Sequence, residues 1–213
     1  MAKLPLIMLG ILLVAIIPVA FAEYDDTIVV IETNSGNLAV EFFHDEAPLH
    51  VEKFVHLSER TFYVDTIFHR IIPGFMIQGG DPFTKSYPDD ESVWGTGTPG
   101  YYLEAEFNDI KHERGIVSMA RSQDPNSAGS QFFIVHNDST FLDGQYTVFG
   151  RLVTQESFDT LDRIASLQTG QNDIPVDSEA AKIIQTTVME RSDITDLLEL
   201  KDPETSSSGF IMK

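Results

Sequence analysis

The sequence contains no cysteine, so its fold depends on neither a disulfide nor a thiolate metal site. Catalysis by a cysteine nucleophile is excluded for the same reason. Basic residues are also scarce, because 14 Lys and Arg stand against 33 Asp and Glu and give a formal net charge of −19. Non-specific binding to nucleic acid needs a basic surface, so this balance argues against a nucleic-acid partner.

The N-terminus lacks charge beyond Lys3 until residue 23. An apolar run over residues 4–22 ends in Ala20-Phe21-Ala22, the small-x-small pattern at which signal peptidase cuts. We interpret residues 1–22 as a signal peptide. The alternative is an uncleaved N-terminal membrane anchor, since the run is nearly long enough to span a bilayer. Both readings place the folded part outside the cytoplasm, as an exported protein that is either secreted or anchored.

The remaining chain is long enough for one domain with a real core, which we assign to residues 23–190, followed by a C-terminal tail over 191–213. Helical spacing of apolar residues predicts helices starting at Pro48 and spanning 155–167. Many short strands with few helices indicate a closed β-barrel or a sandwich. The predicted strands are 27–33, 38–43, 66–72, 76–79, 116–120, 131–136, 146–152 and 182–188.

The most informative segment is Phe68–Asp81, which we predict to be a β-hairpin. If Pro73-Gly74-Phe75 forms a three-residue loop, Arg70 stands opposite Gln78. Alternation along the strands then places both on one face, beside Phe68, Ile72 and Met76. In that arrangement we expect Gln78 to hold the guanidinium of Arg70 in one orientation.

This hairpin offers one guanidinium, one carboxamide and several large apolar groups, without a nucleophile or paired carboxylates. Such a site holds a neutral apolar group and gives it one fixed hydrogen-bond donor. It suits a reaction that breaks no covalent bond.

Two other patterns suggest cofactors and are set aside. Residues 95–100 match the glycine spacing of a dinucleotide fingerprint, but Pro99 interrupts it and no helix is predicted to follow. The six histidines lack the spacing of a helical metal pair. The sequence therefore predicts neither a cofactor nor a metal.

Four segments, in order, resemble the cyclophilin family of peptidyl-prolyl cis-trans isomerases. The first is Phe68–Asp81, and the resemblance covers roughly residues 27–189. It implies a mostly β fold, a closed eight-stranded antiparallel barrel capped by two α-helices. It also implies isomerisation of X–Pro bonds, here in exported polypeptides whose folding the enzyme would assist. The other three segments are Gly115–Ala120, Gly129–Ile134, and Leu142–Gly144 with Val148–Gly150.

The resemblance also assigns roles by position. Arg70 matches the catalytic arginine and Gln78 the glutamine that positions it. The residues that match the proline pocket are Phe75, Met76, Phe133 and Leu142. The residues that match the groove for the preceding peptide are Ala120, Arg121, Ser122 and Gln131.

Two positions depart from the commonest family pattern. Phe141 stands where many members have tryptophan, and Tyr146 where many have histidine. Both keep an aromatic wall, but phenylalanine cannot donate the hydrogen bond of tryptophan, so we expect a cyclosporin-like inhibitor to bind with reduced affinity.

Two alternatives to an enzyme remain at this stage. One is a non-catalytic module that grips proline-containing segments, as a chaperone or scaffold would. The other is a barrel that stores a small ligand, against which the Phe- and Ile-rich strands predict a filled interior. Nothing in the sequence requires more than a monomer.

Overall fold

The computed structural model describes residues 26–194, so the predicted signal peptide and most of the predicted tail lie outside the described residues. The helices are α1 (Pro48–Glu59), α2 (Phe83–Ser86), α3 (Gln155–Ala165) and α4 (Arg191–Ile194). The strands are β1 (Thr27–Thr33), β2 (Gly36–Phe42), β3 (Arg70–Ile72), β4 (Met76–Gly79), β5 (Ile116–Met119), β6 (Phe132–Val135), β7 (Val148–Leu152) and β8 (Ile183–Glu190).

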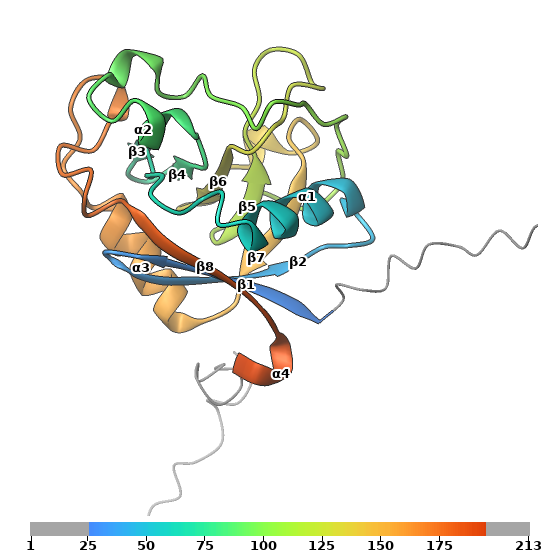
Figure 1. The fold of residues 1–213 in the computed structure, drawn as a ribbon. Coiled ribbons are helices and arrows are strands. Elements are labelled where there is room, and N and C mark those ends of the chain that lie inside the picture. Colours follow the sequence, from blue (N-terminus) through green and yellow to red (C-terminus); the bar gives the residue numbers. More distant parts are fainter. Residues whose placement is uncertain (1–25, 195–213) are drawn as a thin grey trace, which may run out of the picture.

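The strands form one antiparallel sheet in the order β3-β4-β6-β5-β7-β2-β1-β8, which curls into a barrel (Figure 1). The predicted eight antiparallel strands are confirmed, but the word closed is too strong. The edge strands β3 and β8 do not pair along their length. The segment before β3 joins the start of β8 through one bridge, between Ile67 and Lys182, and through neighbouring backbone hydrogen bonds such as that from the N–H of Phe68 to the carbonyl of Ala181 at 3.0 Å. The two edge strands pair so little because β3 is only three residues long, whereas the sequence predicted a strand from residue 66.

The two predicted helices are confirmed and lie on opposite sides of the curled sheet (Figure 1). Pro48 occupies the first turn of α1, where its missing N–H costs no helical bond. The N-cap of α3 is Thr154, whose Oγ1 accepts a 3.0 Å hydrogen bond from the N–H of Ser157. The apolar stripe of each helix is buried against the sheet.

Aromatic rings fill the interior. Phe54 packs against Tyr63, Phe132 and Phe149, with ring centroids 5.1 to 5.2 Å apart, and all four side chains are at most 1% exposed. Such offset and edge-on pairs are favourable beyond the area they bury. The predicted filled interior is confirmed, so a ligand must bind on the outside of the barrel.

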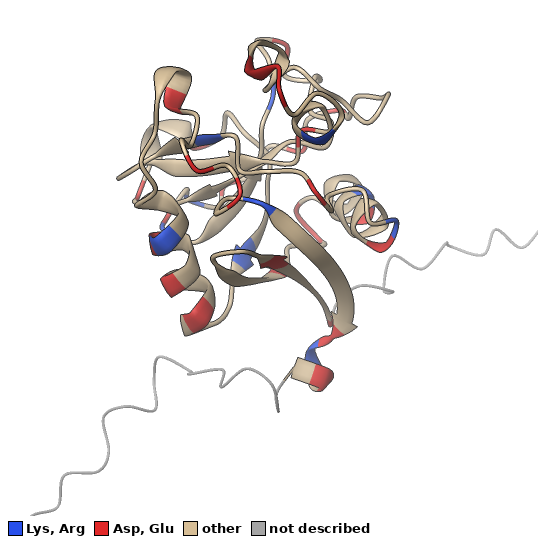
Figure 2. Ribbon diagram, turned by 60° about the vertical axis from the view of Figure 1, so that its left-hand side comes forward, with Lys and Arg blue, Asp and Glu red and all other residues tan. Residues whose placement is uncertain are grey.

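The fold extends to Ile194. This side chain is 1% exposed and packs with Ile28, Val30 and Ala39 on a small outer core. Within residues 26–194, no helix has the length and apolar character needed to cross a lipid bilayer. The few Lys and Arg residues are scattered over the ribbon (Figure 2), in keeping with the acidic net charge.

Candidate active site

The hairpin has the predicted register. Arg70 pairs with Gln78 and Ile72 with Met76, and β4 then pairs with β6 so that Gln78 lies beside Phe133. The loop between β3 and β4 is tied to the end of β6, because the N–H of Gly74 donates to Nδ1 of His136 at 2.9 Å. This contact and the short loop fix the hairpin that carries the candidate catalytic groups.

One predicted neighbour lies elsewhere. Phe68 was expected beside Arg70, but it is fully buried in the main core, where its ring is 5.9 Å from Phe132. The physical reason is that regular strand geometry begins only at Arg70, so the alternation does not extend back to Phe68. His69 is also buried, at 4% exposure, and burial lowers its pKa from 6.5 to about 4, against the opposing charge of Asp81.

The hairpin forms one wall of a pocket of about 110 Å³ on the outside of the barrel. Its apolar floor is well packed, since Met76, Phe133 and Leu142 are 2%, 5% and 8% exposed. The lining residues are Arg70, Phe75, Met76, Gln78, Ala120, Arg121, Phe133, Leu142 and Tyr146.

The hydrogen bonds of Arg70 and Gln78 differ from the prediction. Nε of Arg70 donates to Oδ2 of Asp173 at 3.3 Å, and Nε2 of Gln78 donates to Oε1 of Gln131 at 3.0 Å. No hydrogen bond joins Arg70 to Gln78 within residues 26–194. Gln131 competes with Arg70 for the carboxamide of Gln78, because the pairing of β4 with β6 brings Gln131 and Gln78 together from distant parts of the sequence.

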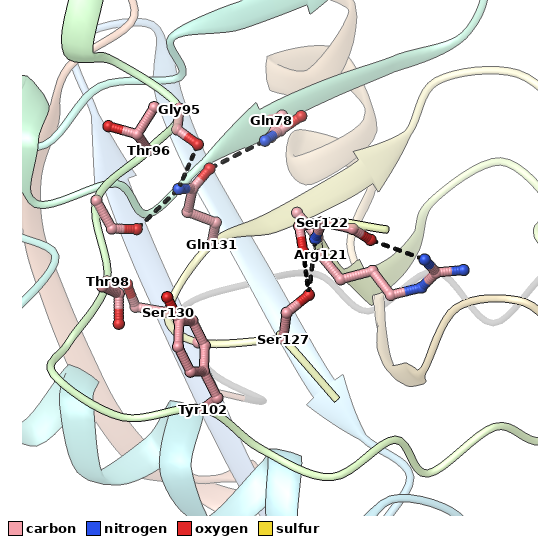
Figure 3. A pocket seen from close by; sticks show the side chains of 13 residues that line it. Gln78, Gly95, Thr96, Thr98, Tyr102, Arg121, Ser122, Ser127, Ser130 and Gln131 are labelled. Carbon is pink, nitrogen blue, oxygen red and sulfur yellow. Dashed lines mark hydrogen bonds between the residues drawn. The ribbon is translucent and has the colours of Figure 1, made fainter. Parts of the chain in front are cut away.

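A second and larger pocket, of about 340 Å³, shares the lining residues Gln78, Ala120 and Arg121 with the first (Figure 3 shows the larger pocket). Gln131 lines the larger pocket, and its Nε2 donates to the carbonyl oxygens of Gly95 and Gly97 at 3.0 and 2.9 Å (Figure 3). The predicted groove residues Ala120, Arg121, Ser122 and Gln131 all line this pocket. Residues 95–98 lie in its wall, and the segment 95–100 is a loop that opens no helix.

Asp81 anchors the 95–97 loop in the wall of the larger pocket, a role that was not identified from the sequence. Its carboxylate is fully buried and accepts hydrogen bonds from the backbone N–H groups of Phe83, Gly95 and Gly97. Buried carboxylates need such donors. The sequence signal available was Asp81 itself, at the end of the hairpin motif just before Pro82.

Two aromatic positions frame the smaller pocket differently. Tyr146 stands edge-on to Phe133 with centroids 5.7 Å apart, and the guanidinium of Arg121 lies 4.6 Å from its ring centre. Such a cation–π contact holds Arg121 at the junction of the two pockets. Phe141 is 65% exposed and lies 5.4 Å from Phe75, so it extends the rim and does not line the pocket.

His112 supports the floor from below, with its ring stacked 6.0 Å from that of Phe133. Burial lowers its pKa, although the nearby carboxylate of Asp143 opposes the shift. Across the described residues, no three His, Asp or Glu side chains come together as a metal site would require.

The model of the family described as cyclophilin type peptidyl-prolyl cis-trans isomerase/CLD matches residues 28–188. A peptidyl-prolyl cis-trans isomerase of Synechococcus elongatus is 42% identical over 147 residues, which cover 69% of this chain and 92% of that protein. The Arabidopsis thaliana isomerase CYP57 is 38% identical over 161 residues, 76% of this chain but only 31% of that longer protein.

Among solved structures, a cyclophilin type peptidyl-prolyl cis-trans isomerase of Cryptosporidium parvum superposes with a TM-score of 0.67. It is 35% identical, and the match covers 76% of this chain and 99% of that one. Sequence, fold and the outer apolar pocket agree: this chain belongs to the cyclophilin family and is a peptidyl-prolyl cis-trans isomerase.

Proposed function

We propose that this isomerase acts on X–Pro bonds of exported polypeptides outside the cytoplasm, where it assists their folding, and that Arg70 is its catalytic donor. The peptide bond resists rotation with a barrier of ~18–20 kcal/mol because of its double-bond character. Cis and trans X–Pro forms are close in energy, so the barrier alone limits their exchange. Lowering it by about 6 kcal/mol accelerates exchange by roughly four powers of ten.

The pocket floor supplies the first part of this effect. Met76, Phe133 and Leu142 would bind the proline ring and remove water from the imide, together with Phe75 at the rim. The charge-separated resonance form that gives the bond its double-bond character is favoured by water. Its loss in an apolar pocket therefore favours the twisted bond.

Arg70 would supply the second part. When the bond twists, the proline nitrogen gains a lone pair that the planar bond does not have. A guanidinium N–H that donates to this lone pair binds the transition state and not the ground state, which is the condition for a higher kcat. The proposed reaction needs no proton transfer and no cofactor.

The observation that carries this proposal is the position of Arg70. The guanidinium stands on the wall of a small pocket whose floor is apolar and almost completely buried. A binding module without catalysis would have no need for a cation at that position. The related Cryptosporidium parvum structure was determined in the presence of the dipeptide Ala-Pro, which supports a proline-containing ligand here.

The larger pocket would hold the residues that precede proline. Its wall presents the Arg121 guanidinium, the Ser122 hydroxyl and the Gln131 carboxamide, which suit the backbone of an extended peptide. Because Phe141 has no hydrogen-bond donor, weak binding of cyclosporin-like inhibitors remains a prediction.

Two experiments test the proposal. The first measures catalysed isomerisation of an X–Pro test peptide and, separately, peptide binding. Binding without turnover would replace the enzyme by the proline-binding module. The second experiment expresses the full chain in cells that have a secretion pathway and determines the mature N-terminus by mass spectrometry. A start at Glu23 supports export and cleavage, and an intact N-terminus on cytoplasmic protein contradicts them.

A refolding assay tests the role in folding. The substrate is an unfolded protein whose refolding is limited by an X–Pro isomerisation, which takes tens to hundreds of seconds without catalysis. The enzyme should accelerate that phase, and it should leave the faster phases unchanged.

A further inference from the structure

We propose that Asp173 is a positioning residue for Arg70, an inference that rests on the proposed catalytic role of Arg70. Oδ2 of Asp173 accepts a 3.3 Å hydrogen bond from Nε of Arg70, across 103 residues of sequence. The two side chains are 45% and 44% exposed. Gln78, the partner expected from the sequence, donates to Gln131. Asp173 is therefore the side chain that orients the guanidinium in the described part of the chain.

The loop that carries Asp173 has a defined shape. Asn172 and Asp173 both adopt the left-handed conformation, with φ of 57° and 62°. This conformation is uncommon for residues other than glycine, although Asn and Asp adopt it more readily than most. Two residues in succession therefore indicate a turn that is held in place.

Backbone hydrogen bonds supply that constraint. Gly170 N–H donates to the carbonyl of Ile174 at 2.8 Å, and Val176 N–H donates to that of Gln168 at 2.8 Å. Thr169 and Pro175 form an antiparallel bridge between them. The carboxylate of Asp173 thus projects from the end of a small closed hairpin toward β3, and it does not depend on a flexible loop.

Asp173 bonds to Nε of Arg70, and this choice of atom explains how Asp173 could position the guanidinium. Arginine has five N–H donors in one plane, and Nε is the donor nearest the flexible stem. A bond at Nε limits rotation of the whole plane while the terminal Nη groups stay available. Those Nη groups form no hydrogen bond within residues 26–194 and belong to a side chain that lines the proline pocket. A donor held in this way loses less freedom when the transition state forms.

The substitutions Asp173→Asn and Asp173→Gly test this directly, because Asn and Gly both tolerate the left-handed conformation. Exposed ion pairs are weak, so we expect kcat/KM for an X–Pro peptide to fall about three- to fivefold at low salt. The loss should appear in kcat with KM unchanged, since Arg70 acts on the transition state. It should shrink near 1 M salt, where the Debye length is only about 3 Å, and Asp173→Glu should restore part of the rate.

A double-mutant cycle separates positioning from a purely structural role. If Asp173 acts through Arg70, Asp173→Asn should have no further effect in an Arg70→Ala background. The NMR signal of the Arg70 Nε–H provides an independent readout, and it should shift and exchange faster in Asp173→Gly, which removes the acceptor oxygen. The matched control is Glu179→Gln, an exposed acid whose carboxylate pairs with Lys182 at 2.6 Å; this variant should keep the wild-type rate.

Two results would overturn the inference: an unchanged rate and Nε–H signal in Asp173→Gly, which leaves no side-chain acceptor, or an equal loss of rate in the presence and absence of Arg70. Neither result would affect the proposed role of Arg70, which fails only if Arg70→Ala itself keeps the wild-type rate.

Discussion

Gln78 donates a 3.0 Å hydrogen bond to Gln131, although it stands directly opposite Arg70 in the hairpin. Gln131 then donates to the carbonyl oxygens of Gly95 and Gly97 in the wall of the larger pocket. This relay joins the smaller pocket to the loop that borders the larger one. The position of Gln78 in the hairpin is therefore coupled to a segment that would contact the residues before proline.

Loss of this relay should affect long substrates more than short ones. In Gln131→Ala, both bonds to the 95–97 loop and the bond from Gln78 are removed. A net hydrogen bond contributes about 0.5–1.5 kcal/mol, so we expect KM for a peptide with three residues before proline to rise roughly two- to tenfold. KM for a minimal X–Pro substrate should change little. Gln123→Ala, at an exposed neighbouring position, is the control, and equal effects on both substrates would contradict the relay.

His69 should make the stability depend on pH. Burial lowers the pKa of His69 from 6.5 to about 4, so between these values the unfolded chain binds a proton that the folded chain does not. Stability therefore falls as the pH falls through this window, by up to about 1.4 kcal/mol per pH unit for this one group. Urea unfolding from pH 7 to pH 4 measures the slope.

The variant His69→Phe removes that proton and should flatten the slope, whatever its absolute stability. His56→Gln, on the exposed face of α1, controls for the loss of a histidine elsewhere. An unchanged slope in His69→Phe would show that other groups cause the pH dependence.

Gly80 should be the less replaceable of two glycines with similar backbones. Gly80 and Gly144 have φ of +82° and +69°, so an alanine at either position has the same left-handed strain of about 1–2 kcal/mol. At Gly80 the added Cβ would also lie 2.5 Å from the carbonyl oxygen of Ser130, whereas at Gly144 nothing lies within 4 Å. We expect Gly80→Ala to lower the free energy of unfolding by a further ~1–3 kcal/mol. Equal losses in the two variants would contradict this contact.

The sequence predicted the features that follow from local geometry. Alternation with a period of two, together with a short loop at Pro73-Gly74-Phe75, was sufficient to pair Arg70 with Gln78. Helical spacing likewise located the start of α1, and both ends of α3 to within about two residues. Strand alternation held from Arg70 onward, where regular strand geometry begins.

The errors arose where distant segments decide the outcome. Gln78 was assigned to Arg70, but Gln131, 53 residues away, provides its acceptor. Asp173 could not be connected to Arg70, because its pattern is that of an ordinary polar turn and 103 residues separate the two. Phe68 turns into the core because the strand starts later than its β-prone composition suggested.

The most direct test of the catalytic account is the rate of X–Pro isomerisation catalysed by Arg70→Ala, measured beside wild type and Arg70→Lys with matched unfolding curves. Loss of one preorganised donor in a water-poor site typically lowers kcat by about 10²–10³, and we expect a fall of that order for Arg70→Ala. Arg70→Lys should recover part of the rate, since it keeps the charge but not the planar donors. A folded Arg70→Ala variant that isomerises the peptide as fast as wild type would contradict the account.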